Sequence, residues 1–95
     1  MEPYPLKKLD FYKVRKDFTS DSGYQDAVTF KVGMLIQYQK SISNIHDMIE
    51  IIHFEDCNTK SALVWRTRIE NLYGHWQEYL EPIPNPYLLS GRSFL

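Results

Sequence analysis

The most apolar run of the chain extends from Met48 to Phe54, and it limits the folds that the chain can adopt. It is rich in isoleucine and carries apolar side chains at both odd and even positions. A strand that is covered on both faces has this pattern, whereas a strand with one face in water alternates between apolar and polar residues. We therefore predict a central strand here, with other elements packed over each of its faces.

Three further extended segments are predicted around this strand. Residues 11–18 alternate between apolar and charged side chains, which is typical of a half-buried strand. Residues 28–39 form a second extended region, in which Gly33 predicts a bulge or tight bend. Residues 62–67 are expected to return beside the central strand and to complete a hairpin with it.

Three polar segments are expected to turn the chain between these strands. Residues 19–23 combine turn formers with Gly23, and residues 40–44 are also polar and turn-like. Residues 55–60 are interpreted as the hairpin loop after the central strand. The resulting sheet has about four antiparallel strands.

One helix is predicted from about Arg68 to Leu80, ending before Pro82. Its evidence is the helical spacing of Ile69, Leu72, Tyr73, Trp76 and Leu80. The alternative is a further hairpin that turns at Tyr73-Gly74. Beyond the helix, three closely spaced prolines predict a stiff, extended tail.

These elements predict an α+β fold in one domain that covers residues 1–95. The 95 residues suffice for one hydrophobic core and are too few for two. The expected sheet is small and antiparallel, SH3-like or a half-barrel, and it is followed by the C-terminal helix. We expect a folded core at residues 10–81 and the proline-rich extended tail at residues 82–95.

The single cysteine, Cys57, excludes an internal disulfide and argues against a secreted disulfide scaffold. Residues 1–8 carry charges and prolines where a signal peptide needs an apolar run, and the sequence holds no apolar stretch of membrane-spanning length. The sequence therefore predicts a cytoplasmic protein that does not enter a membrane.

The first 40 residues resemble a group of short, uncharacterised bacterial proteins. The resemblance is carried by Tyr12-x-Val14-x-x-Asp17-Phe18-Thr19, followed by Gly23 and Gly33. Met34 stands where that group usually has glutamate, and the loop before Gly33 is longer. The resemblance implies a small β-rich bacterial domain and supplies no activity or ligand.

The residues that could form a catalytic or metal site do not match the patterns that such sites need. His53, Glu55, Asp56 and Cys57 lie close together, but one cysteine and one histidine do not meet the requirements of a zinc site. The neighbouring acids would raise the pKa of the thiol, which argues against a reactive thiolate. No phosphate-binding glycine loop is present. We therefore predict no metal, no cofactor and no enzymatic activity.

The charge argues against nucleic acid as a partner, because phosphate binding needs a basic surface and the formal net charge is −1. Trp65, Tyr73, Trp76 and Tyr79 are better explained as core residues than as a platform on which bases stack. A single-stranded nucleic-acid binder is the least favoured of the binding functions considered.

The acidic middle of the chain and the aromatic content favour a protein interface. Between Asp21 and Lys60, six acidic residues stand against three basic ones. Carboxylates steer association and aromatic side chains anchor it, as in small proteins that inhibit or confer immunity against a larger partner. The alternative is an adaptor or assembly component, and a homodimer is also possible. The predicted contact residues are Asp47, Glu50, Glu55, Asp56, Tyr87, Leu88, Leu89 and Phe94.

The apolar residues after Pro82 leave two alternatives open. The tail serves association, or it folds back over the second face of the central strand.

Overall fold

The computed structural model describes residues 4–20 and 28–89, and side chains up to Tyr87. The strands are β1 (Phe11–Val14), β2 (Phe18–Thr19), β3 (Thr29–Phe30), β4 (Leu35–Asn44), β5 (Ile49–Asp56), β6 (Ala62–Arg68) and β7 (Leu80–Ile83). The helices are α1 (Ile69–Tyr79) and α2 (Pro86–Leu89). This confirms a small α+β domain.

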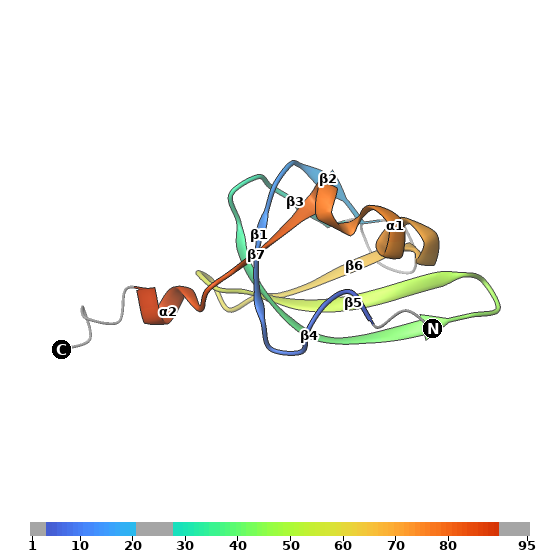
Figure 1. Ribbon diagram of the computed structural model, residues 1–95, viewed down its shortest axis with the longest axis horizontal. Coiled ribbons are helices and arrows are strands. Elements are labelled where there is room, and N and C mark those ends of the chain that lie inside the picture. Colours follow the sequence, from blue (N-terminus) through green and yellow to red (C-terminus); the bar gives the residue numbers. More distant parts are fainter. Residues whose placement is uncertain (1–3, 21–27, 90–95) are drawn as a thin grey trace.

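Five of the strands form one antiparallel sheet in the order β6-β5-β4-β1-β7, and β2 pairs with β3 in a separate ribbon (Figure 1). The predicted hairpin of β5 and β6 is confirmed, with Ile52 opposite Trp65. The predicted helix is confirmed as α1, and the chain continues from it directly into β7.

The turn predicted at residues 40–44 is wrong, because these residues are the second half of β4. The pairing of β4 with β5 shifts between Tyr38 and Lys40, which is the mark of a bulge, and then continues to Asn44 opposite Ile49. The apolar strand β5 supplies the ladder that keeps these polar residues extended. The chain turns instead between Ile45 and Met48, whose φ of 58° lies in the left-handed region.

The strand predicted at residues 11–18 divides into β1 and β2, which belong to different sheets. After Val14 the chain leaves the main sheet, and Gly33 with φ of 92° turns the returning segment into β4. The ring of Phe18 then stacks on Phe30 with centroids 4.7 Å apart and lies 4.9 Å from the ring of Trp65. The ribbon of β2 and β3 therefore covers part of the core.

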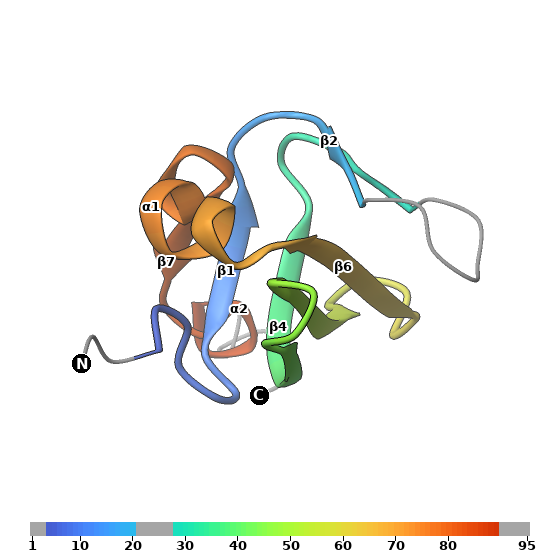
Figure 2. The ribbon, with the colours of Figure 1, turned by 90° about the vertical axis from the view of Figure 1, so that its right-hand side faces the viewer.

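Helix α1 packs on one face of the sheet, which we call the inner face (Figure 2). Its Leu72 is fully buried, Trp76 meets Tyr12 edge-on at 6.1 Å, and Tyr79 lies 5.4 Å from the ring of Trp65. The inner face and the elements over it form the hydrophobic core. Its buried members include Tyr12, Val14, Phe30, Ile36, Tyr38, Ile52, Phe54, Trp65, Leu72 and Leu80.

The prediction that the 48–54 segment is a central strand covered on both faces is wrong. Strand β5 is second from the edge, and β4 is the central strand. In β5, Ile52 and Phe54 point into the core, whereas Ile49 and Ile51 are half-buried on the opposite face. Only the inner face is fully covered within the described part of the chain.

The tail was predicted to be extended from residue 82, and its first residues are extended as part of β7, which pairs with β1 in the sheet. In β7, Pro82 lies opposite Tyr12 at the edge of the sheet, where the missing N–H of proline breaks no ladder hydrogen bond. At the other edge, the backbone N–H of Arg66 in β6 donates to the Ser20 hydroxyl at 2.8 Å. Each edge strand thus has one residue that does not offer a free backbone N–H, Pro82 in β7 and Arg66 in β6.

The described end of the chain folds back onto the body through Tyr87. Its hydroxyl donates to the carbonyl oxygen of Cys57 at 3.0 Å and also contacts the ammonium of Lys60. Its ring meets Phe11 edge-on, with centroids 5.8 Å apart. These contacts hold Tyr87 on the body. The side chains of Leu88, Leu89, Phe94 and Leu95 lie outside the described part of the chain, so the two alternatives for the tail stay open.

We expect Tyr87→Ala to lower the free energy of unfolding by about 1–3 kcal/mol, because it removes a ring contact and a hydrogen bond. Tyr87→Phe removes only the hydroxyl and is expected to cost about 1 kcal/mol. Urea unfolding of both variants measures the two effects. Unchanged midpoints would show that this segment does not stabilise the domain.

Candidate functional site

Glu50, one of the predicted contact residues, is buried in the inner face and has no exposed surface. The Ser43 hydroxyl donates to its Oε1 at 2.5 Å, and its Oε2 has no hydrogen-bond partner in the described part of the chain. Burial raises the pKa of the neighbouring Tyr4 far above its ordinary value, and the Glu50 carboxylate adds to this shift. Glu50 was predicted as a surface contact, and the structure instead places it in the core.

The other predicted acidic residues do not form one patch. Asp47 bonds to Asn44 in the turn between β4 and β5, at one end of β5. At the other end, Asp56 accepts the backbone N–H groups of Asn58 and Thr59. A strand of eight residues is about 26 Å long, so these carboxylates lie too far apart to act together. Both stabilise turns.

The remaining predicted contact residues lie elsewhere. Glu55 is half-buried on β5, beside Gln37 and Ala62 on the neighbouring strands. Tyr87 is docked against Phe11, while Leu88 and Leu89 belong to α2. Phe94 lies outside the described residues. The structure therefore does not bring the predicted set together.

The side chains considered for chemistry are not assembled into a reactive centre. Within residues 4–20 and 28–89, no group of three His, Cys, Asp or Glu side chains is placed to hold a metal ion. Cys57 is buried, and this burial raises the pKa of its thiol, with Asp56 and Glu55 adding to the effect. Burial and the charge of Lys40 lower the pKa of His53.

The aromatic side chains considered as a stacking platform are used in the core, as expected. Trp65 is only 2% exposed and contacts Phe18 and Tyr79. Tyr73 lies edge-on to Tyr4.

A polar hollow at the start of α1 is lined by Thr67, Arg68, Glu70, Asn71 and His75. In that hollow Arg68 already pairs with Glu70 at 2.9 Å.

An apolar surface that was not predicted lies at the end of the β4–β5 hairpin. Ile42, Ile45 and Met48 are 53%, 75% and 49% exposed, and we call these three residues the hairpin tip. Figure 1 shows this hairpin reaching beyond α1. The signal was present in the sequence, because Ile42 and Ile45 are large apolar residues inside a stretch that is otherwise polar.

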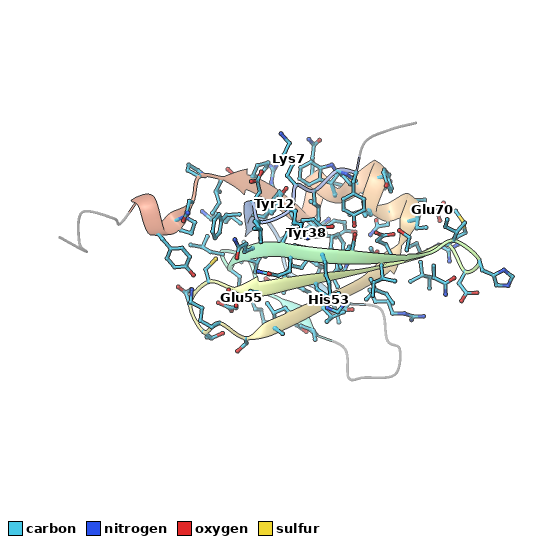
Figure 3. All side chains as sticks on the ribbon, turned by 90° about the horizontal axis from the view of Figure 1, so that it is seen from below. Lys7, Tyr12, Tyr38, His53, Glu55 and Glu70 are labelled. Carbon is cyan, nitrogen blue, oxygen red and sulfur yellow. The ribbon has the colours of Figure 1, made fainter. Side chains whose placement is uncertain are left out.

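The hairpin tip continues onto the face of the sheet opposite α1, which we call the outer face. Strand pairing places three rows across β4, β5 and β6 on this face: Asn44, Ile49 and Arg68, then Ile42, Ile51 and Arg66, then Lys40, His53 and Val64. In Figure 3, His53 and Glu55 lie along β5 and Tyr12 lies on the side of α1. Isoleucines thus occupy the middle of the face, and cationic residues stand on both sides of them.

No helix in the described ranges is long and apolar enough to cross a membrane. Comparison of the chain with family models, curated proteins and solved structures finds no match.

Proposed function

We propose that this protein is a small protein-binding domain that contacts its partner through the hairpin tip and the outer face. The observation that carries the proposal is the exposure of Ile42, Ile45 and Met48 at one end of one hairpin. Contiguous exposed apolar side chains with a polar rim are typical of interaction sites, whereas isolated ones are ordinary. An inhibitor or immunity-type role is our first choice, and an adaptor or assembly component is the alternative.

The sheet supports this role as a rigid platform, and we infer that it is an SH3-like half-barrel. Strands β1, β4, β5 and β6 follow one another as neighbours, and β7 returns after α1 to pair with β1. The hairpin tip is thereby held by a ladder that extends to Asn44 opposite Ile49. Side chains on such a ladder lose little further freedom on binding, which favours affinity.

The proposal predicts that a double variant at the tip, Ile45→Ser with Met48→Ser, loses its partner while the fold is kept. Both side chains are at least 49% exposed, so the loss of stability is expected to stay below about 0.5 kcal/mol. The wild type and the variant are immobilised, and captured proteins from the source cell are identified by mass spectrometry. A partner that binds through the tip is captured by the wild type and is depleted at least about tenfold by the variant.

The matched control is Val32→Ser, because Val32 is 62% exposed but precedes β4 at the end far from the tip. This control is expected to capture the partner as the wild type does. Loss of the partner's activity on adding the purified domain would distinguish an inhibitor from an adaptor. Equal capture by the wild type and the tip variant would contradict the proposed function, as would capture of no specific protein.

A further inference from the structure

The width and the charge pattern of the outer face match those of a binding surface for one helix. From β4 to β6 it spans two strand spacings, about 10 Å, which is close to the diameter of an α-helix. The length of β5, eight residues or about 26 Å, matches about 18 residues of helix. Ile49 and Ile51 lie along the first half of the middle of this strip, and His53 and Glu55 follow them on β5.

Cations stand on both long sides of the strip. Lys40 on β4 is exposed beside His53, and Arg68 on β6 lies opposite Ile49. The pair that Arg68 forms with Glu70 is exposed on both sides, at 64% and 75%, so a competing carboxylate can replace it at little cost. Glu55 lies on the same face, at the end of β5 away from Ile49. Around Ile49 and Ile51 the charged neighbours on β4 and β6 are cationic, so this part of the strip is complementary to an apolar segment that carries acids on both of its flanks.

We propose that the outer face binds an amphipathic α-helix of a partner protein, whose apolar stripe lies along Ile49 and Ile51 and whose acidic residues flank that stripe. This inference deepens the proposed function and rests on it. The helix would form a third layer, with α1 on the inner face and the partner helix on the outer face, which is a stable way to cover both sides of a sheet.

A second copy of this chain does not supply such a helix. Leu72 of α1 is fully buried, and Tyr73 and Trp76 pack on the core of their own subunit. The surface that α1 shows to solvent includes Gly74, His75, Gln77 and Glu78 and is polar. The occupant is therefore sought in another protein.

The test uses two synthetic helical peptides of about 18 residues with the same leucine stripe. One carries glutamates on both flanks of the stripe and the other carries lysines. Each is titrated into the isotope-labelled full chain, and amide chemical shifts map the contact. We expect the glutamate peptide to bind at least about tenfold more tightly in low salt, with shifts centred on β4, β5 and β6, and this preference to shrink at about 0.5 M salt.

Charge reversal provides the matched control. Lys40→Glu with Arg68→Glu is expected to turn the preference toward the lysine peptide, whereas Lys8→Glu, at another exposed lysine, is expected to leave it unchanged. Ile51→Asp is expected to weaken both peptides at least about thirtyfold. Thermal melts confirm that each variant is folded, and Ile51→Ser replaces Ile51→Asp if the latter is not.

Three results would overturn the inference. They are equal binding of both peptides, chemical shifts that map away from the outer face, and binding of the chain to anionic lipid vesicles with no binding of the glutamate peptide. If the tip-dependent partner is captured and the glutamate peptide does not bind, the helical occupant is wrong and the proposed function stands. If neither binds, both are wrong.

Discussion

Trp65→Ala is expected to lower the free energy of unfolding by about 3–5 kcal/mol, the range for emptying a buried aromatic site. Trp65 is 2% exposed, and its ring lies 4.9 Å from that of Phe18 and 5.4 Å from that of Tyr79. It therefore joins β6, the β2–β3 ribbon and α1. Because a domain of this size has a total stability of about 5–10 kcal/mol, the variant is expected to be partly unfolded at 37 °C. Urea unfolding followed by circular dichroism measures the loss.

Val64→Ala is the control for Trp65→Ala, because Val64 is the neighbouring residue on β6 and is half-buried on the outer face. It is expected to cost about 1 kcal/mol or less. A loss below about 1 kcal/mol for Trp65→Ala would contradict the position of this ring at the junction of the three elements.

Glu50→Met is expected to stabilise the domain by about 1–4 kcal/mol. The carboxylate is fully buried, and among the described residues Oε1 accepts the Ser43 hydroxyl while Oε2 has no hydrogen-bond partner, although the buried Tyr4 hydroxyl lies near the carboxylate. Removing a carboxylate from water costs more than one hydrogen bond returns, and methionine fills a similar volume with apolar atoms. The difference in urea midpoint between the wild type and Glu50→Met measures the gain.

A double-mutant cycle with Ser43→Ala tests the cause of this gain. In the wild type, Ser43→Ala removes the hydrogen bond to Oε1 and is expected to destabilise by about 1–3 kcal/mol. In the Glu50→Met background the hydroxyl has lost its acceptor, and the same change is expected to be close to neutral. A destabilising Glu50→Met would show that the carboxylate has a further favourable contact in the folded state.

The helix and the β5–β6 hairpin were predictable because local patterns specify them. The spacing from Ile69 to Leu80 defines one helical face, and Pro82 ends the pattern. The segment at residues 40–44 was not predictable in this way, because its polar side chains are held extended by pairing with β5. The division of residues 11–18 likewise depends on Phe18 contacting Phe30 and Trp65, which are distant in sequence.

The candidate site was only partly predictable from the sequence. A count of charged residues does not show whether each side chain points into the core or to the surface. Glu50, Ile52 and Phe54 are at alternate positions of β5, so their side chains point to the same face. This face is the core side, which places Glu50 in the core. Asp47 and Asp56 bind backbone and side-chain groups of the turns that contain them. Ile42 and Ile45 stand out in the sequence as apolar residues in a polar stretch, and the extension of β4 beyond the bulge explains why Ile42 is exposed.

The features at the two sheet edges affect how this protein behaves at high concentration. Pro82 cannot donate a backbone hydrogen bond from β7, and the Ser20 hydroxyl occupies the N–H of Arg66 on β6. Open sheet edges with free backbone groups are templates on which further chains polymerise into cross-β fibres. In this protein, the rows of backbone groups on β6 and β7, the outermost strands of the main sheet, are each interrupted at one of these residues. Growth of a fibre from the two outermost strands of the main sheet is therefore disfavoured at these two positions.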